Sequence, residues 1–258
     1  MDKKIISFSL YGTDEKYWQG ALRNTELQQE FYPDWICRFY VSQEIHQDII
    51  KQLSNAGAEI VKKTRKDFSD GMFWRFLPAS DPDMDILIVR DTDSRLGLRE
   101  RLAVNEWLES GKNFHIMRDH PQHGTLILGG MWGCKKNVIP YMLGLVALWD
   151  KFEQIGRDQN FLAQKIYPRI RNSCLIHSDL ICYEDEKTFP FPSQRKNFEF
   201  VGKPFNGNEL IHNEAVHTFD DTTKKVLPSS KSQVKKALVK SFIKIEDFMA
   251  KKITEKVL

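Results

Sequence analysis

Two aspartates separated by one residue follow the most apolar run in the sequence. Asp91 and Asp93 come directly after residues 85–90, which are rich in Ile, Leu and Val. In an extended chain the side chains of residues i and i+2 point to the same side, about 6 to 7 Å apart. Two such carboxylates can share one hard cation, and Mg²⁺ or Mn²⁺ completes its shell with water and phosphate oxygens. The spacing indicates a divalent-metal site for a diphosphate-bearing substrate, although an Asp after a strand also serves as a turn or helix-cap residue.

Alternating strands and helices precede this pair. Strands are predicted over 4–11, 35–42 and 59–63, and helices over 15–30 and 47–56. This alternation is typical of a doubly wound sheet with parallel strands. The continuous apolar run before Asp91 then predicts a central strand that is buried on both faces. Asp91 and Asp93 would lie at its carboxyl end, where open α/β sheets bind their ligands.

The rest of the chain continues the same pattern with one long interruption. Further helices and strands are predicted at 98–110, 113–117, 138–152, 158–167 and 174–182. Residues 118–136 have almost no periodicity, and long irregular stretches of this kind often carry function. Residues 187–208 contain three prolines among aromatic side chains and are predicted to be an ordered coil.

Composition and motifs exclude several classes of protein. The chain has 258 residues, 28% charged and 12% aromatic side chains, and a net charge of +3, so neither a disordered chain nor a nucleic-acid-binding protein is indicated. Four scattered cysteines without a C-x-x-C pair predict no zinc site or disulfide framework and favour a reducing compartment. No signal peptide, membrane span, G-x-G-x-x-G, P-loop or G-x-S-x-G element is present in the sequence.

With these motifs in place, the sequence resembles the GT-A glycosyltransferases of bacterial capsule or lipopolysaccharide assembly. Three segments carry the resemblance: 86–95 around the D-x-D motif, 129–133 (Gly-Gly-Met-Trp-Gly) and 158–162 (Asp-Gln-Asn-Phe-Leu), with a later match at 200–204. It implies a GT-A-like fold, Rossmann-like with a mixed, mainly parallel sheet between helices. It also implies a hexosyltransferase-type enzyme that uses a nucleoside diphosphate sugar and Mn²⁺ or Mg²⁺.

The resemblance implies roles for individual residues around the metal. Asp91 and Asp93 would bind the cation, with Thr92 between them at the donor. Such enzymes commonly add a third ligand, often a His, late in the chain, for which His177 and His212 are the candidates. His177 is preferred because it lies in a predicted strand near Asp179, although a His bonded within the fold is an equally good interpretation.

The resemblance also places two residues beside the reacting sugar. Asp158 would act as a general base or would stabilise positive charge at the anomeric carbon, and Gln159 would accompany it. Asp158 can equally be the N-cap of the helix that it begins. In the irregular loop, Asp119, His120 and His123 are further candidates for a base or for binding acceptor hydroxyls.

Other residues are expected to contact the donor. Gly130 lets the backbone approach a sugar while Trp132 offers an apolar platform, unless the pair is a tight turn with a core indole. Arg75 and Arg95 would pair with the diphosphate or form structural ion pairs instead. The carboxyl end of the first strand, with Ser9, Tyr11 and Gly12, would receive the base and ribose. The assignment of Ser9, Tyr11 and Gly12 rests on topology and on the resemblance.

The sequence thus predicts a catalytic domain over 1–230 that transfers a sugar to a carbohydrate or lipid-linked acceptor. One alternative is a phosphotransferase of the haloacid dehalogenase type with Asp91 as nucleophile. In that class the D-x-D motif normally follows the first strand, whereas three predicted strands precede it here. The other alternative is a protein that binds a sugar nucleotide or glycan without catalysis.

Residues 231–258 form a separate, basic segment. They contain eight lysines against three acidic side chains, and apolar residues recur every three or four positions from Val234 to Val257, which predicts an amphipathic helix. The helix could dock on the anionic inner face of the cytoplasmic membrane, so that the protein would be cytoplasmic and peripheral. Packing on the protein's own core or on a second subunit is the alternative.

Overall fold

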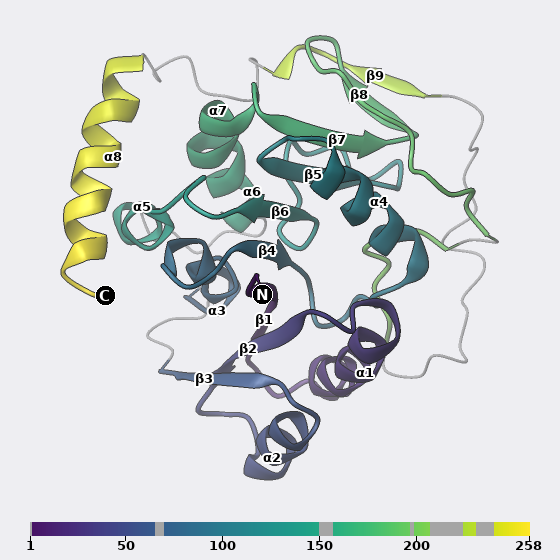
Figure 1. The fold of residues 1–258 in the computed structure, drawn as a ribbon, viewed down its shortest axis with the longest axis vertical. Coiled ribbons are helices and arrows are strands. Elements are labelled where there is room, and N and C mark those ends of the chain that lie inside the picture. Colours follow the sequence, from purple (N-terminus) through teal and green to yellow (C-terminus); the bar gives the residue numbers. More distant parts are fainter. Residues whose placement is uncertain (1, 65–69, 150–156, 197–198, 207–223, 231–239) are drawn as a thin grey trace.

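A computed structural model describes residues 2–64, 70–149, 157–196, 199–206, 224–230 and 240–258. The central feature is one seven-stranded sheet with strand order β3-β2-β1-β4-β6-β5-β7 (Figure 1). Six strands are parallel, and β6 runs antiparallel between β4 and β5. The strands are β1 Lys4–Leu10, β2 Ile36–Ser42, β3 Glu59–Lys63, β4 Ile86–Val89, β5 Phe114–Arg118, β6 Trp132–Lys135 and β7 Cys174–Ser178.

Helices cover both faces of the sheet, and each face has its own apolar core. In β4, Leu87 and Val89 contribute to one core and Ile88 to the other, as expected for a strand buried on both sides. The core with Ile88 lies under α1 Glu15–Phe31, α2 Gln47–Asn55 and α4 Leu98–Glu109. The other lies under α3 Asp70–Trp74, η1 Leu77–Ser80, α5 Met142–Leu148, α6 Arg157–Phe161, η2 Leu162–Ile166 and α7 Tyr167–Ile170. This is the mixed, mainly parallel sheet between helices that the sequence predicted for a GT-A-like fold.

One strand lies inside the stretch that the sequence left irregular. β6 pairs with β4 and β5 although it has only four residues and contains a glycine. A Cβ on Gly133 would lie 2.8 Å from the Leu87 carbonyl oxygen, so the glycine permits the close pairing. A strand this short shows no clear alternation, which explains why periodicity did not reveal it.

The predicted C-terminal helix is present and packs on the body of the protein. α8 Lys240–Glu255 lies along α5 at the edge of the molecule (Figure 1). A Cβ on Gly144 would lie only 2.0 Å from the Ala250 carbonyl oxygen, and the Gly144 N–H donates to Thr254 Oγ1 at 3.1 Å. The expected start of this segment, 231–239, lies outside the described residues. No described helix is long and apolar enough to cross a membrane.

A small second sheet completes the fold. β8 Ile181–Tyr183 and β9 Lys225–Leu227 pair in parallel beyond β7. The sequence predicted one strand over 174–182, whereas the structure divides this region into β7 and β8. Parallel pairing places the carboxyl ends of β1, β4, β5 and β7 along one edge of the main sheet, and the candidate site lies there.

Candidate active site

Arg75 joins two carboxylates that are far apart in the sequence. Its Nη2 donates to Asp158 Oδ2 at 2.8 Å, and its Nη1 donates to Asp91 Oδ1. Asp91 follows β4, Asp158 lies in the first turn of α6, and Arg75 follows α3. The sequence therefore predicted three residues of one cluster, and for Arg75 it left open a contact with a diphosphate or a structural ion pair. In the structure the guanidinium pairs with the protein's own carboxylates.

Residues at the carboxyl end of β1 contact this cluster. The Arg75 N–H donates to Ser9 Oγ at 3.0 Å, which ties the residue after α3 to the first strand. Tyr11 packs edge-on against Trp74, with ring centroids 6.2 Å apart. Burial raises the pKa of the Tyr11 phenol, as do the nearby carboxylates of Asp158 and Asp91, while Arg75 opposes the shift. Ser9 and Tyr11 thus lie against the cluster, at the sheet edge where the sequence placed the donor.

Two glycines allow the irregular loop to pass directly over these carboxylates. A Cβ on Gly130 would lie 2.1 Å from Asp91 Oδ2 and 2.8 Å from the Asp91 nitrogen. A Cβ on Gly129 would lie 2.2 Å from Asp158 Oδ2 and 2.5 Å from Arg75 Nη2. All four distances are far below van der Waals contact, so a side chain at either position would force its neighbours to move. The Gly-Gly pair is explained by its packing against the acidic cluster.

Burial and charge shift the pKa values of Asp93, Asp158 and Arg75 in this cluster. Burial raises the pKa of Asp93 to about 6, and the neighbouring Asp91 carboxylate adds to the shift. Burial also raises the pKa of Asp158, while Arg75 opposes that rise. For Arg75 itself, burial favours the neutral form, but Asp91 and Asp158 outweigh it and hold the pKa above its ordinary value. Arg75 is therefore a permanent cation among three carboxylates.

Asp91 and Asp93 fit a divalent cation that the protein holds through two ligands. Both offer hard carboxylate oxygens, and the Asp91 side chain is 41% exposed. The Asp91 carboxylate contributes to the raised pKa of Asp93, which indicates a negative field that a cation would relieve. Among the residues that the structure describes, no group of three or more His, Cys, Asp or Glu side chains could hold a metal. Such a site would leave further positions for phosphate oxygens and water, as Mg²⁺ and Mn²⁺ favour.

Thr92 and Arg95 have structural partners in this turn. Thr92 is buried, and its carbonyl oxygen lies against α1, where a Cβ on Gly20 would approach it to 2.0 Å. Arg95 Nη1 donates to the Ser94 carbonyl at 3.0 Å, and its guanidinium stacks over Phe205 at 4.7 Å. These contacts favour the second of the two predicted roles of Arg95, a structural one. They shape the turn that presents Asp91 and Asp93.

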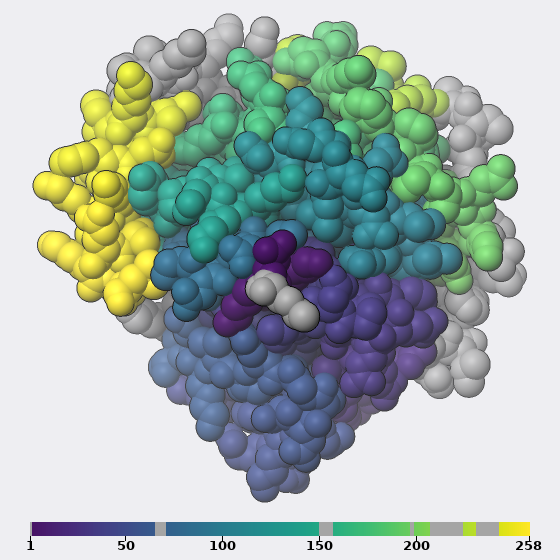
Figure 2. Space-filling view, in the orientation of Figure 1, coloured from purple at the N-terminus to yellow at the C-terminus, as the bar shows by residue number. Residues whose placement is uncertain are grey.

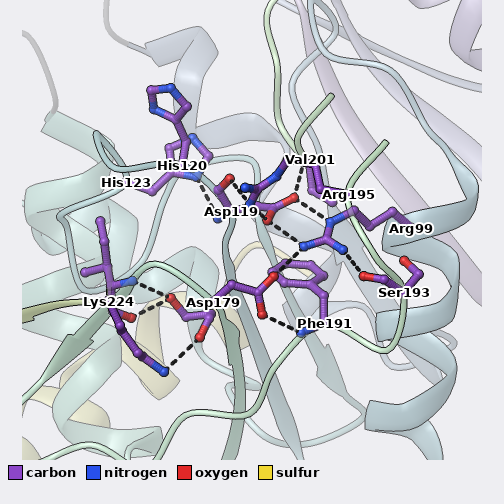
Figure 3. Close-up of polar contacts among 12 residues, drawn as sticks. Arg99, Asp119, His120, His123, Asp179, Phe191, Ser193, Arg195, Val201 and Lys224 are labelled. Atoms are coloured by element: carbon purple, nitrogen blue, oxygen red, sulfur yellow. Dashed lines mark hydrogen bonds and ion pairs between the residues drawn. The ribbon is translucent and has the colours of Figure 1, made fainter. Parts of the chain in front are cut away.

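Asp119 is the centre of a separate buried network (Figure 3). Arg99 binds it through two nitrogens at 2.8 and 2.9 Å, Arg195 donates to it at 2.5 Å, and the Val201 N–H donates at 2.9 Å. The carboxylate is fully buried. Because both oxygens are occupied and shielded from solvent, these contacts favour a structural role for Asp119 over the predicted role of a base or of a group that binds acceptor hydroxyls. Asp119 ties Arg195 and the Val201 backbone to the end of β5.

The two histidines of the loop support the same network. His123 Nδ1 accepts the Asp119 N–H at 3.0 Å, and burial lowers the pKa of His123 to about 3. His120 Nδ1 accepts the Gln122 N–H, and its ring packs on Phe200 at 4.4 Å. Figure 3 shows both rings beside Asp119. Both side chains are largely buried, so their contacts account for the loop conformation.

Two further predicted residues lie away from the cluster. His177 is fully buried in β7, where its Nδ1 pairs with His115 Nε2 at 2.8 Å, and strands β6 and β5 separate it from β4. The structure therefore does not bring His177 to Asp91 and Asp93. Trp132 is also fully buried and stacks on Phe114 at 5.3 Å, which favours the second of its two predicted roles, a core indole. The other candidate, His212, lies outside the described residues.

Sequence reasoning missed the return of the chain to the D-x-D turn. The Phe205 N–H donates to the Asp93 carbonyl at 2.8 Å, more than a hundred residues along the chain. Gly202, with a φ of +82°, allows the preceding turn, and a Cβ there would lie 2.5 Å from Met131 Sδ. Gly202 was the signal in the sequence that could have indicated this turn.

Gln159 lies next to Asp158 and is partly exposed. Its N–H donates to Asp158 Oδ1 at 2.9 Å.

The chain was compared with family models, with curated proteins and with solved structures, and the solved structures alone gave matches. No family model matches the chain, and no curated protein matches it. A Bacillus anthracis protein assigned as a glucose-1-phosphate thymidylyltransferase is 11% identical with a TM-score of 0.46, over 69% of this chain and 86% of that one. Glucosyl-3-phosphoglycerate synthase from Mycobacterium tuberculosis is 14% identical with a TM-score of 0.43, over 67% and 69%.

A third solved structure covers nearly the whole chain. The 4-diphosphocytidyl-2C-methyl-D-erythritol synthase from Anaerococcus prevotii is 11% identical with a TM-score of 0.44, over 95% of this chain and 96% of that one. By name, these three proteins are one thymidylyltransferase and two synthases. At these identities the argument for function rests on the site of this chain.

Proposed function

We propose that this protein is a glycosyltransferase that moves a sugar from a nucleoside diphosphate donor to a carbohydrate acceptor. The observation that carries the proposal is the Arg75 cluster. A buried guanidinium, the two D-x-D carboxylates and Asp158 meet at the carboxyl edge of a mainly parallel sheet. This edge is where such sheets bind their ligands.

The charges of the cluster suit a leaving diphosphate. Asp91 and Asp93 would hold the Mn²⁺ or Mg²⁺ implied by the sequence resemblance, and the bound cation would stabilise the negative charge that develops on the leaving group. Arg75 is held charged by its two carboxylate partners and can donate two parallel hydrogen bonds, which is the geometry that matches phosphate oxygens. In this proposal Arg75 orients the donor by exchanging one protein carboxylate for a phosphate oxygen.

Asp158 is the second chemical group of the proposal. Its ion pair with Arg75 opposes the rise in pKa that burial causes, which favours the carboxylate form. A carboxylate at this place can accept a proton from the acceptor hydroxyl or stabilise positive charge at the anomeric carbon. The same ion pair orients its Oδ2 toward Arg75, while Oδ1 accepts the Gln159 N–H. The acceptor in this proposal is a glycan of a bacterial surface polysaccharide, as the sequence resemblance implies.

A donor screen tests the proposal directly. The full chain would be mixed with nucleoside diphosphate sugars that differ in base and sugar, each with and without Mn²⁺, and binding would be measured by calorimetry. Donors that bind would then be incubated with oligosaccharide acceptors. We expect at least one donor to bind in a Mn²⁺-dependent way and to be consumed with formation of a glycosidic bond.

Three other results would contradict the proposal in different ways. Donor binding with neither transfer nor hydrolysis would identify a sugar-nucleotide-binding protein. A phosphoryl group trapped on Asp91 would identify a phosphotransferase. Absence of binding by every donor in the presence of Mn²⁺ would remove the sugar-nucleotide class altogether.

A further inference from the structure

The helix α8 has an inner face that is fully engaged with the body of the protein. Ala250 and Thr254 are buried against α5. Both acidic residues in the middle of the helix also face inward: Glu246 pairs with Lys165 at 2.5 Å and with Arg169 at 2.9 Å, and Asp247 pairs with Arg169 at 2.8 Å. The helix is therefore anchored by close packing and by ion pairs.

The outer face of α8 and the chain end is apolar. Its side chains are among the most exposed large apolar ones of the described residues: Ile245 58%, Phe248 58%, Met249 48%, Val257 63% and Leu258 71%. Three of them belong to the apolar stripe that the sequence predicted. These three side chains of the stripe thus point away from the body, and Ala250 and Thr254 make the packing contact. Figure 2 shows α8, in yellow, along one edge of the molecule.

Lysines flank this apolar surface. Lys244, Lys251, Lys252 and Lys256 are exposed, whereas Glu255 is the one exposed acidic residue among the described side chains of the helix. Glu255 lies 3.7 Å from Lys251, and Lys252 stacks over Phe248 at 4.6 Å. Because Glu246 and Asp247 are neutralised on the inner side, the outer surface combines excess positive charge with apolar side chains.

We propose that this outer face of α8, Ile245, Phe248 and Met249 with their flanking lysines, docks on an anionic lipid surface. A helix with an apolar face and a lysine-rich border inserts its apolar side chains at the headgroup level, while the lysines contact anionic lipids. A second copy of this chain fits less well, because it would bring an equally basic face toward the first. An anionic lipid surface complements both the charge and the apolar character.

Docking in this orientation leaves the rest of the fold unchanged. The inner contacts with α5 and α7 stay in place, so the helix serves as a rigid platform. The lipid surface would thus bind a preformed site, with no ordering of the helix required. This proposal does not depend on sugar transfer, because it rests only on the exposed side chains of α8 and its charge.

Vesicle co-sedimentation of the full chain tests the proposal. Vesicles of phosphatidylcholine with phosphatidylglycerol would be compared with vesicles of phosphatidylcholine alone. We expect binding to the anionic vesicles, weakened by added salt. The double substitution Ile245→Ser/Phe248→Ser should weaken it at least about tenfold through lost apolar burial. Lys244→Gln and Lys256→Gln should each weaken it about fivefold.

A matched control comes from β9. Lys225 and Val226 are also exposed, with Val226 60% exposed, but they lie on the small sheet. Lys225→Gln/Val226→Ser should bind vesicles like the unchanged chain. Circular dichroism would verify that each variant keeps its helix content. The proposal is overturned by equal binding of α8 and β9 variants, by absence of binding to anionic vesicles, or by a dimer that the α8 substitutions dissociate.

Discussion

Arg75 forms an ion pair with Asp91, the first carboxylate of the D-x-D motif, and binds Asp158 with the same guanidinium. The ion pairs that the sequence offered as the alternative to a diphosphate contact are thus present in the structure. An internal cation keeps two carboxylates close together where repulsion would otherwise separate them or neutralise them.

Removing this internal cation should make the protein more dependent on a metal ion. Arg75→Ala leaves Asp91 and Asp158 without their partner, and breaking a buried ion pair in this way costs about 3 kcal/mol of unfolding free energy or more. Mn²⁺ should restore part of the loss, because it can occupy the negative site. Denaturant unfolding of both proteins with and without Mn²⁺ checks this. Equal stabilisation of the two by Mn²⁺ would speak against the placement of the cation.

Gly130 should tolerate no side chain. In Gly130→Ala the new methyl group would meet Asp91 at 2.1 Å, so either the loop or the carboxylate must move. We expect donor binding with Mn²⁺ to weaken at least tenfold, measured by calorimetry. Gly124→Ala is the matched control in the same loop, since its nearest neighbour would be a Leu227 methyl at 3.9 Å. Similar binding by both variants would show that the close approach is unimportant.

Asp119→Asn separates a structural role from a catalytic one. The substitution removes the charge that pairs with Arg99 and Arg195, so the unfolding free energy should fall by about 3 kcal/mol. Asp179→Asn should cost less, because that carboxylate is 30% exposed whereas Asp119, which also pairs with Arg99, is fully buried. Chemical denaturation measures both. Unchanged stability of Asp119→Asn together with a large loss of turnover would restore the catalytic assignment.

His123 should make stability fall in mild acid. Its pKa is lowered to about 3, first by burial and then by His120 and by Arg118 and Arg195, while Asp119 opposes the shift. The unfolded chain therefore takes up the proton first as the pH drops below about 6.5, and stability present above that pH is lost. The loss should be about 2 kcal/mol between pH 6.5 and 5.

A substitution assigns this pH dependence to one side chain. His123→Asn keeps an acceptor for the Asp119 N–H but cannot titrate, so the slope of stability against pH should decrease. His46→Asn, at an exposed helix cap, is the control substitution. Unfolding curves at several pH values compare the three proteins. Identical slopes in His123→Asn and the unchanged chain would refute the assignment.

The sequence predicted the parts of this site that depend on local pattern. The apolar run before Asp91 identified β4, and the alternation of strands and helices predicted the mainly parallel sheet with Asp91 and Asp93 at the carboxyl end of that strand. The partners of Arg75 and Asp119 could not be predicted, because Asp158 and Arg195 are 83 and 76 residues away from them and pairing over such distances depends on packing. The fully buried positions of Trp132 and His177 likewise follow from the insertion of β6, which has no periodic signal of its own.

The amphipathic pattern of residues 231–258 predicted the helix but not the face that packs on the protein. Its period correctly predicted a helix, yet the face that packs on α5 was not the most apolar one. Gly144 and Ala250 allow two backbones to approach closely, so small residues and inward ion pairs made that contact. The apolar stripe therefore predicted the helix but did not predict which of its faces packs on α5.

The two D-x-D carboxylates carry the central claim, and their removal is the most direct test. Binding of a nucleoside diphosphate sugar would be measured by calorimetry with and without Mn²⁺ for the unchanged chain, Asp91→Asn and Asp93→Asn. Asp83→Asn is the control, because it changes an exposed carboxylate before the amino end of β4. We predict that Mn²⁺ strengthens donor binding in the unchanged chain and in Asp83→Asn, and that this gain is lost in both D-x-D variants. A folded Asp91→Asn and Asp93→Asn that retain the full Mn²⁺-dependent gain would contradict the account.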